Sequence, residues 1–466
     1  MIDVKESNIE MKLQQAVDQA ASRRTGQLVS ITHKIDSVDP IHFFETAKLL
    51  NKDRIFWSNA VDDFYLVGIG QATEIEPSQS RLDSIETKWQ NMLRESIVHN
   101  PYALPGTGLI ALGGMSFDPK KKRSRLWGNY SVSHFTIPEY LLTKVEGACY
   151  FTTTVIVDSK TDVSQLMHMV HEDKHQLLNT AITLPDASYV THKEEVEPEQ
   201  WMETVKKAIT ALNNNEAKKI VLAREMRLKL NDRAEISPML EKLLHMQTNS
   251  YVFAFEKKGD CFIGATPERL VRVDGDQLLS TSLAGTAPRG KTETEDKQIA
   301  ADLFNDSKNR HEHDYVVQMI KQSIQNYCTH IDIPEEPFVY PLKNLYHLYT
   351  PVHAVLKTGY TILDIVQQLH PTPALGGEPR EASLAFIRDH ELLDRGWYGA
   401  PIGWLDSNNH GEFAVAIRSG LIQQDEVSLF AGCGVMQDSD PVEEYAETNI
   451  KFLPMLSVME DQHGSY

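Results

Sequence analysis

One stretch of the chain, residues 251–285, most strongly limits what this sequence can fold into. It reads YVFAF, the turn EKKGD, CFIGATPERLVRV, the turn DGD and QLLSTSLAG. Apolar, β-branched runs separated by short Gly- and Asp-bearing turns are typical of an antiparallel meander. Two further runs of this kind, GEFAVAIRSGLI and VSLFAGCGV, lie near the C-terminus. The sequence therefore predicts extensive antiparallel sheet.

Helical patterns flank these strands. Residues 294–327 form a long periodic stretch that predicts a helix, and a closing helix is well marked by Asp440 as N-cap, Pro441 at its first position and Glu443 in capping-box register. Strands and helices are mixed without a βαβ alternation. We therefore predict an α+β fold, with large mixed, mainly antiparallel sheets packed with flanking helices.

A polar segment without periodicity, residues 183–198, divides the chain. Before it, an opening helix and short strands predict an N-terminal scaffold half, residues 1–195. After it, residues 196–460 carry most of the sharp local signals and form the expected catalytic region. We expect the two parts to make one intertwined globular unit.

Composition excludes several classes of protein. The chain of 466 residues has 46 Lys and Arg against 65 Asp and Glu, a net charge of −19, and no dense basic block. We therefore expect no binding to nucleic acid or to anionic membranes. The four cysteines, at 149, 261, 328 and 433, form no CxxC pair, and no window of 18 uncharged apolar residues or secretion signal is found. These features predict a cytoplasmic protein that does not span a membrane.

One motif points to nucleotide binding but lacks the context. Residues 285–292, GTAPRGKT, satisfy the phosphate-loop pattern GxxxxGK[ST]. A functional phosphate loop needs a run of backbone N–H donors and a helix that starts at its lysine. Here Pro288 lacks one donor, the preceding strand belongs to a meander, and KTETEDK delays the helix. We therefore predict a turn.

Two ionisable residues sit in apolar surroundings. Lys219 opens the strand KIVLAR, and alternation places it on one face with Val221 and Ala223 while Lys218 points the other way. Glu268 lies in FIGATPERLV, between apolar runs. A strand-end lysine that reaches water and a glutamate at a turn are the simpler explanations. If they are buried instead, Lys219 can act as a base and Glu268 as an acid.

Two acidic residues lie on predicted helices. Glu312, in KNRHEHDYVVQMI, shares a face with Val316 and Met319, so it can face inward. The HEH triplet around it lacks the i, i+4 histidine spacing of a zinc site. Glu447 and Lys451 lie four residues apart, as in a surface salt bridge. The carboxylates together suggest a hard cation with oxygen ligands, most simply Mg²⁺.

Two glycine-bearing loops follow the pattern of anion sites. They are HPTPALGGEPR, residues 370–380, and AGCGVMQDSDP, residues 431–441. The backbone N–H groups of Gly432 and Gly434 could hold a carboxylate, with the guanidinium of Arg418 as a charged partner. A hairpin turn with an edge arginine is the alternative.

In this order, the motifs resemble those of the chorismate-utilising enzymes, the family of isochorismate, salicylate, anthranilate and aminodeoxychorismate synthases. The resemblance is dense over residues 200–458 and looser before them. It is carried by KIVLAR, GATPERL, LAGTAPRG, SKNRHEH, HLYTPV, HPTPALGG, DRGWYGAPIGW, GEFAVAIRS, AGCGV and ETNIK. Cys433 departs mildly from the family pattern, in which small residues such as Ala are common there. GTAPRGKT corresponds to the family's LAGT-PRG turn.

The resemblance also indicates the type of reaction. Anthranilate synthases carry Gln where this chain has Lys219 and use ammonia, whereas members that add water carry Lys. The HPTPALGG segment resembles isochorismate synthases, and salicylate synthases usually have a different sequence there. We therefore expect an isochorismate synthase, and the length resembles the menaquinone-pathway enzymes of Gram-positive bacteria. The alternatives are a siderophore-pathway isochorismate synthase, a salicylate synthase or an inactive binding protein.

The roles of individual residues follow from the same resemblance. Lys219 resembles the base that activates water, which requires a neutral amine, and Glu268 resembles the acid that protonates the departing hydroxyl, which requires partial protonation. Glu312 and Glu447 resemble ligands of Mg²⁺. The residues that resemble the substrate-binding set are Gly285, Thr286, His347, Ala374, Arg418, Gly432 and Lys451. The implied substrate is chorismate, and with water as nucleophile we expect a monomer without an amidotransferase subunit.

Overall fold

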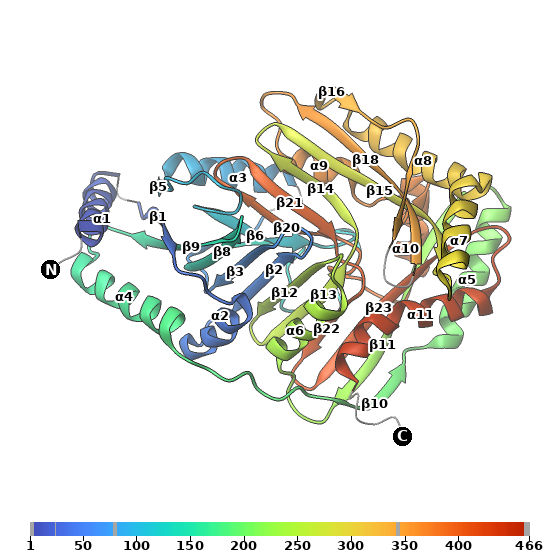
Figure 1. Cartoon of the computed structure of the whole chain (residues 1–466), viewed down its shortest axis with the longest axis horizontal. Helices are drawn as coiled ribbons and strands as arrows, with labels where there is room; N and C mark the ends of the chain where they lie inside the picture. The colour runs from blue at the N-terminus through green and yellow to red at the C-terminus, as the bar shows by residue number, and fades with distance from the viewer. Residues whose placement is uncertain (1–3, 24, 78–81, 342–344, 461–466) are drawn as a thin grey trace.

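Two large β-sheets form the body of the protein (Figure 1). The computed structural model describes residues 4–23, 25–77, 82–341 and 345–460. Sheet A has 13 strands. In spatial order these are β10 (Val190–Glu195), β11 (Lys219–Leu230), β23 (Glu426–Val435), β22 (Ser419–Gln423), β13 (Asp260–Thr266), β12 (Tyr251–Lys257), β2 (Arg54–Asn59), β3 (Phe64–Ile69), β8 (Tyr140–Val145), β9 (Ala148–Val157), β1 (Gln27–Ile35) and β5 (Ile97–His99), with β19 (Gly377–Glu378) paired to β11.

Sheet B has 10 strands. In spatial order these are β16 (Cys328–Asp332), β18 (Leu345–Leu356), β15 (Gln277–Pro288), β14 (Arg269–Asp274), β21 (His410–Val415), β20 (Pro401–Asp406), β6 (Ile110–Met115), β7 (Ser133–Ile137) and β4 (Thr73–Ile75), with β17 (Phe338–Pro341) paired to β18. Among the described strands, the pairing of β1 with β5 is parallel and the other pairings are antiparallel. The predicted α+β fold with mainly antiparallel sheets is confirmed.

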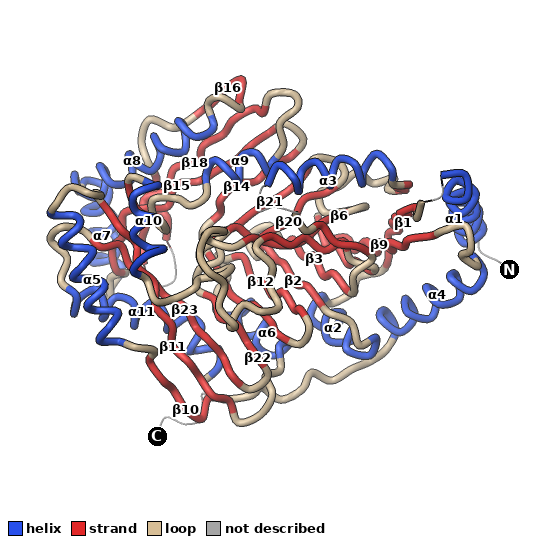
Figure 2. Tube along the Cα trace, turned by 180° about the vertical axis from the view of Figure 1, so that it is seen from behind, coloured by secondary structure: helices blue, strands red, loops and turns tan. Residues whose placement is uncertain are grey.

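The helices cover the outer faces of the two sheets. They are α1 (Val4–Arg23), α2 (Pro40–Thr46), the 3₁₀ turn η1 (Ala47–Leu50), α3 (Leu82–Glu95), α4 (Val163–Asn179), α5 (Pro198–Asn213), α6 (Ile236–Met246), α7 (Glu293–Asn305), α8 (Ser307–Ile324), α9 (Ile362–Leu369), α10 (Arg380–His390) and α11 (Pro441–Met459). Figure 2 shows α5, α10 and α11 beside β11 and β23, the strands that carry much of the candidate site.

The helix predicted over 294–327 is instead two helices. Asp306 ends α7 and serves as the N-cap of α8, where its side chain accepts a hydrogen bond from the Asn309 N–H. Its extended backbone, with ψ 114°, interrupts the helical path and lets α8 take a new direction. The closing helix begins as predicted, because the Asp440 carboxylate accepts from the N–H groups of Val442 and Glu443.

The predicted meander is divided between the sheets. β12 and β13 lie in sheet A, whereas β14 and β15 lie in sheet B. Pro267 and Glu268 link the two sheets at this point, and a proline cannot donate a hydrogen bond to a sheet ladder. The chain crosses again between β21 and β22, at residues 416–418.

An apolar core fills the space between the sheets. It joins Trp57 on β2 and Phe262 on β13 in sheet A to Trp404 on β20 in sheet B, all three buried. Strands from both sides of residue 195 pair directly, as in β2 with β12 and β6 with β20. We therefore propose that the chain is one folding unit rather than two separable domains. Within the described residues, no helix combines the length and apolarity that crossing a membrane would require.

Candidate active site

The two crossings between the sheets bring Glu268 and Arg418 together. The Val415 N–H donates to the Glu268 carbonyl at 3.0 Å, and the Ala265 N–H donates to the Arg418 carbonyl at 3.1 Å. Arg418 has φ +50°, a left-handed conformation that is costly for a residue with a side chain. These two backbone hydrogen bonds hold the two crossing segments next to each other. This arrangement fixes a carboxyl group and a guanidinium at the same end of both sheets.

Electrostatics at this crossing favours a protonated carboxyl. Burial raises the pKa of Glu268 to about 7, and the positive charge of Arg418 opposes that rise only in part. Burial also lowers the pKa of Arg418 from its ordinary value, while the Glu268 charge raises it. A carboxyl group whose pKa lies near neutrality can give up a proton at physiological pH. The raised pKa of Glu268 is the direction that the acid role implied by the family resemblance requires.

Lys219 lies at the start of β11 and faces inward. Its side chain is 25% exposed, against 75% for Lys218, as alternation along the strand predicts. Lys219 Nζ lies 3.5 Å from Glu312 Oε1 on α8. A Cβ atom at Gly434 on β23 would lie 2.6 Å from Lys219 Cε, so the lysine side chain passes over Gly434, and a larger residue there would displace the end of that side chain.

Glu312 is less buried than its helical spacing suggests. Its side chain is 52% exposed, whereas Val316 and Met319 pack against the core beneath it. Glu312 therefore does not pack into the core, and the inward direction that its helical spacing allows is toward Lys219. Glu312 lies at the edge of the apolar face of α8, where its carboxylate reaches Lys219 across from β11.

A second wall of the site is formed by β15, β18 and α8. Gly285 has φ +75°, and the Thr286 N–H donates to Asn309 Oδ1 on α8 at 3.3 Å. Thr286 Oγ1 lies 3.0 Å from His347 Nδ1 on β18. Burial, with a smaller contribution from the charge of Arg418, lowers the pKa of His347 to about 4, while the hydrogen bond to the Gly285 carbonyl opposes this shift. His347 is therefore a neutral hydrogen-bonding group at pH 7, placed between Thr286 and Arg418.

Helix α11 brings further polar groups to the end of β23. Lys451 Nζ lies 2.6 Å from Glu447 Oε1 and donates to the Gly432 carbonyl at 2.9 Å. The predicted ion pair between Glu447 and Lys451 is present. Burial and the Glu444 carboxylate raise the pKa of the Cys433 thiol, and Glu447 adds to this effect. The carboxylates of Glu444 and Glu447, one helical turn apart, thus face the same part of β23.

The backbone N–H of Gly432 points toward the polar side chains of α11. Opposite Gly432, Ala223 uses its N–H and carbonyl in bonds to Glu391 and Trp201, on the side away from β23. Gly432 is therefore in a non-hydrogen-bonded pair, and its own N–H and carbonyl point to the other side, where Lys451 meets the carbonyl. Pairing of β22 with β23 ends at Ser419 opposite Phe430, two residues before Gly432. This geometry allows the Gly432 N–H to donate a hydrogen bond to an anion.

Two residues at the site were missed in the sequence. Tyr398 lies near Gly432, since a Cβ atom there would be 3.4 Å from the tyrosine hydroxyl. Burial raises the pKa of Tyr398, the positive charge of Arg395 opposes that rise, and the Glu391 carboxylate adds to it. The second is Glu444, whose Oε1 accepts from the Ser439 hydroxyl at 2.6 Å and whose carboxylate faces the Cys433 thiol. DRGWYGAPIGW and ETNIK include or adjoin these residues, but neither motif shows which side chain faces inward.

Ala374 lies in the loop that leads into β19. The residue is exposed, and β19 pairs Gly377 with Ile220 and Glu378 with Lys219. The loop is therefore anchored to the first residues of β11. This places Ala374 on a segment fixed to the strand of Lys219.

The phosphate-loop motif has another role. The Gly290 N–H and the Arg289 side chain both bind the Asp296 carboxylate, and the Lys291 N–H donates to Glu295 Oε2. Thr292 caps α7. Residues 285–288 belong to strand β15, so the turn predicted over the whole motif is confined to residues 289–292. Side-chain carboxylates already occupy the donors that would face a phosphate, so the motif is not a phosphate loop.

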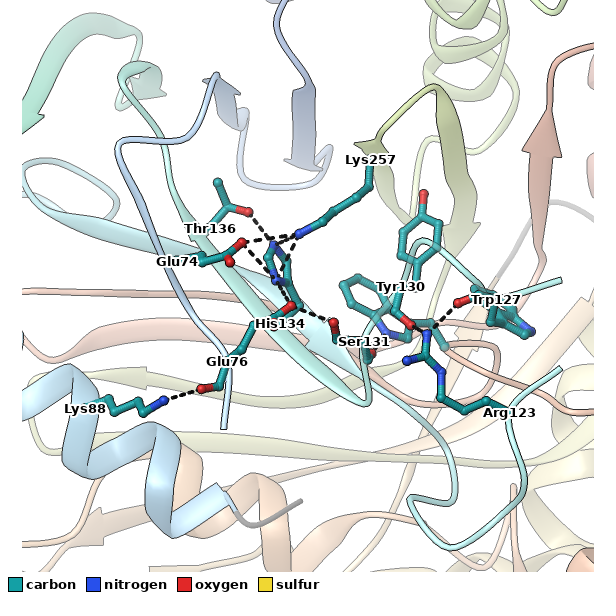
Figure 3. A network of polar contacts seen from close by, with 11 residues as sticks. Glu74, Glu76, Lys88, Arg123, Trp127, Tyr130, Ser131, His134, Thr136 and Lys257 are labelled. Carbon is teal, nitrogen blue, oxygen red and sulfur yellow. Dashed lines mark hydrogen bonds and ion pairs between the residues drawn. The ribbon is translucent and has the colours of Figure 1, made fainter. Parts of the chain in front are cut away.

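A cluster of metal-type ligands occurs elsewhere, as Figure 3 shows. Among the residues that the structure describes, one ligand atom each from Glu74, Glu76 and His134 lie within 4.8 Å of one another. Lys257 Nζ lies 2.8 Å from His134 Nε2 and 3.4 Å from Glu74 Oε2, so an ammonium already serves as the cation. The cluster lies at the β4–β7 edge of sheet B, whereas Thr286 and His347 lie toward the other edge.

Glu312 and Glu447 have the chemistry of a hard-cation site. Carboxylate oxygens on partly exposed side chains are the ligands that Mg²⁺ prefers, since it retains several waters. Glu444, one turn before Glu447, adds a further carboxylate beside Cys433 of β23. The donor chemistry of these residues fits Mg²⁺, and without the ion each carboxylate pairs with a lysine, Glu312 with Lys219 and Glu447 with Lys451.

Comparison with known proteins agrees with this geometry. A family model described as "Chorismate binding enzyme" matches residues 13–460. Isochorismate synthase MenF of Bacillus subtilis (strain 168) is 36% identical over 444 residues, 93% of each chain. The salicylate biosynthesis isochorismate synthase of Pseudomonas aeruginosa is 32% identical over 95% of this chain and 92% of its own length.

The fold also matches a solved structure. That structure is MenF, the menaquinone-specific isochorismate synthase from Escherichia coli, with a TM-score of 0.79 and 24% identity. The match covers 96% of this chain and 100% of that chain. The similarity therefore spans both sheets and the residues gathered between them.

Proposed function

Because this chain belongs to the family of chorismate-binding enzymes, we propose that it is an isochorismate synthase, an isomerase that converts chorismate to isochorismate. The family predicted from sequence motifs is confirmed by the family model and by relatives matched over nearly the whole chain. One structural observation supports the chemistry most directly. Glu268 is a carboxyl group whose pKa of about 7 lets it carry a proton at neutral pH.

The reaction exchanges one hydroxyl group for another. Water adds at C2 of the ring, the double bonds shift, and the C4 hydroxyl leaves as water, so the product has the mass of the substrate. Lys219 is the base that removes a proton from the attacking water. Glu268 is the acid that protonates the departing hydroxyl. Inward placement of Lys219 and partial protonation of Glu268 support this division of roles.

Recognition of the substrate carboxylates falls to groups at the ends of β22 and β23. Arg418 and the Gly432 N–H bind the enolpyruvyl carboxylate, and Lys451 provides a further contact. The carbonyl bond from Lys451 to Gly432 holds that ammonium beside the N–H donor. Gly285, Thr286, His347 and Ala374 line the ring. The Thr286–His347 hydrogen bond and the neutral state of His347 support a polar but uncharged contact there.

Glu312 and Glu447 hold Mg²⁺ in this proposal. When bound, the ion neutralises the ring carboxylate of a dianionic substrate in a protein whose net charge is −19. The protein's part is to present two carboxylates, Glu312 from α8 beside Lys219 and Glu447 from α11 beside Lys451.

A salicylate synthase is the second candidate within the family. Such an enzyme forms isochorismate and then eliminates pyruvate. The HPTPALGG segment, which resembles isochorismate synthases, argues against that step. The relative from Pseudomonas aeruginosa is named for salicylate biosynthesis but is itself an isochorismate synthase by name.

The experiment is to incubate purified protein with chorismate, with and without Mg²⁺. Organic acids are separated by liquid chromatography with mass detection, and pyruvate is assayed in parallel. We expect a new peak of unchanged mass that requires Mg²⁺ and appears without pyruvate. Salicylate with pyruvate would establish the lyase instead, and unchanged chorismate would contradict both.

We also propose the pathway in which the enzyme acts, its location in the cell and its oligomeric state. The relative named MenF and the structural match support use of the product in menaquinone biosynthesis. Loss of menaquinone on deletion of the gene, restored by added isochorismate-derived intermediates, would test this. The four buried free thiols support a reducing, cytoplasmic location. We propose a monomer without an amidotransferase subunit, which light scattering of the purified protein tests.

A further inference from the structure

The outer edge of β11 has a gap in its strand pairing. β10 pairs with Met226–Leu230 and β19 pairs with Lys219 and Ile220, so none of the described strands pairs with residues 221–225 on that side. A hollow of about 350 Å³ opens outside this gap, lined in part by Ala223, Trp201 and residues 392–394. Exposed backbone groups at such an edge need other partners.

Side chains take the place of the missing strand. The Ala223 N–H donates to Glu391 Oε2 at 2.8 Å, and the Ala223 carbonyl accepts from Trp201 Nε1 at 3.1 Å. The Val221 carbonyl accepts from Arg395 Nη2 at 2.8 Å. Glu391 and Arg395 thus complete the edge of the strand that begins with Lys219.

Glu391 and Arg395 form a buried, bidentate ion pair. Arg395 Nε lies 2.6 Å from Glu391 Oε1, and Arg395 Nη2 lies 2.7 Å from Glu391 Oε2. The Arg395 guanidinium also stacks on the Phe117 ring, 4.2 Å from its centroid. Both side chains are almost inaccessible to solvent. A planar guanidinium that is bound by a carboxylate along one edge and packed against a ring on one face has little freedom to move.

The remaining nitrogen of the Arg395 guanidinium binds the loop that carries Ala374, which lines the substrate ring in the proposed function. Arg395 Nη1 donates to the Leu375 carbonyl at 3.0 Å, and Leu375 follows Ala374 directly. One guanidinium therefore connects Val221, two residues after Lys219, with the loop that carries Ala374. Tyr398, near Gly432, is bound to the same segment through the bond from its N–H to the Arg395 carbonyl at 2.8 Å.

We propose that Arg395, oriented by Glu391, is a positioning residue that sets the separation between the base Lys219 and the loop of Ala374. This inference rests on the proposed function, since it assigns a role in that reaction. Arg395 touches neither Lys219's amine nor the substrate position. It acts through the backbone of β11 and of the loop, so its loss should lower the rate of the chemical step more than the affinity for substrate.

The test separates positioning from stability. Arg395→Lys keeps the charge beside Glu391 but cannot reach both carbonyls. The double variant Glu391→Gln, Arg395→Met removes both charges together, so no unpaired charge is left buried, and the glutamine oxygen can still accept from Ala223. Lys229→Met, at the exposed far end of β11, is the matched control. For each protein, kcat and KM for chorismate and the Tm are measured.

We expect the double variant to fold, with kcat lowered about 100-fold and KM changed far less, because misplacement of reacting groups by about 1 Å has effects of that size. Arg395→Lys should also fold and lose activity, and Lys229→Met should retain it. Wild-type kcat in either folded Arg395 variant would overturn the positioning role. An inactive wild-type protein would instead contradict the proposed function.

Discussion

Replacing Glu268 with glutamine should abolish turnover and, at alkaline pH, stabilise the folded protein. The side chain lies where the chain crosses from sheet A to sheet B, and burial raises its pKa from an ordinary 4.5 to about 7. Glutamine has nearly the same shape as the protonated acid but never becomes charged. It therefore removes the proton that the departing hydroxyl needs and also the penalty of burying a carboxylate.

The size of the effect follows from the two pKa values. Between pH 4.5 and about 7, the native state binds more protons than the unfolded state, because its carboxyl has the higher pKa. The free energy of unfolding therefore falls as pH rises through this window. Above it, the ionised carboxylate costs the native state about 3 kcal/mol. At about pH 5 the cost is about 1 kcal/mol, because most of the native carboxyl is still protonated.

Urea unfolding, followed by tryptophan fluorescence at both ends of this range, measures the difference. We expect Glu268→Gln to exceed the wild type in stability by about 3 kcal/mol at about pH 9 and by much less at about pH 5. Glu426→Gln, an exposed substitution on β23, is the control and should show no such dependence. Equal stability differences at the two pH values would refute the raised pKa, and full turnover in Glu268→Gln would refute the acid role.

Three further outcomes follow from the site. Lys219→Ala should remove isochorismate formation while circular dichroism and Tm stay close to those of the wild type, and full activity would contradict the role as base. Glu447→Ala should raise the Mg²⁺ concentration needed for half-maximal rate about tenfold or more, whereas Glu443→Ala on the same helix should not. Lys291→Ala should leave turnover unchanged, and ATP should not raise the Tm of the wild type, because Asp296 and Glu295 occupy the donors of that turn.

Local signals in the sequence were sufficient for several parts of the fold. Alternation along KIVLAR placed Lys218 and Lys219 on opposite faces, and the structure shows that Lys219 is the one that faces inward. The N-cap at Asp440 fixed the start of α11. Pro288 and the delayed helix correctly ruled against a phosphate loop at 285–292. Each of these depends on interactions within a few residues, which side-chain type and spacing determine.

Other features could not be predicted, because the sequence has the same periodicity on both sides of the point where the chain changes direction. The run 251–285 has the alternation of one meander, yet it passes from sheet A to sheet B at Pro267 and Glu268. The periodicity over 294–327 continues across Asp306, where one helix ends and the next begins. Alternation shows that a strand exists but not which sheet receives it, since that choice depends on partners far away in the chain.

The amino-acid sequence by itself determined the fold class, the family and the residue types available for acid–base chemistry. Tertiary structure decided which of those residues meet: Glu268 with Arg418 at paired crossings, Lys219 with Glu312, and Arg395 with the edge of β11. The pKa of Glu268 is also a tertiary property, because it arises from burial by segments distant in sequence. Motifs specify local geometry, whereas desolvation and long-range hydrogen bonding exist only once the sheets have packed.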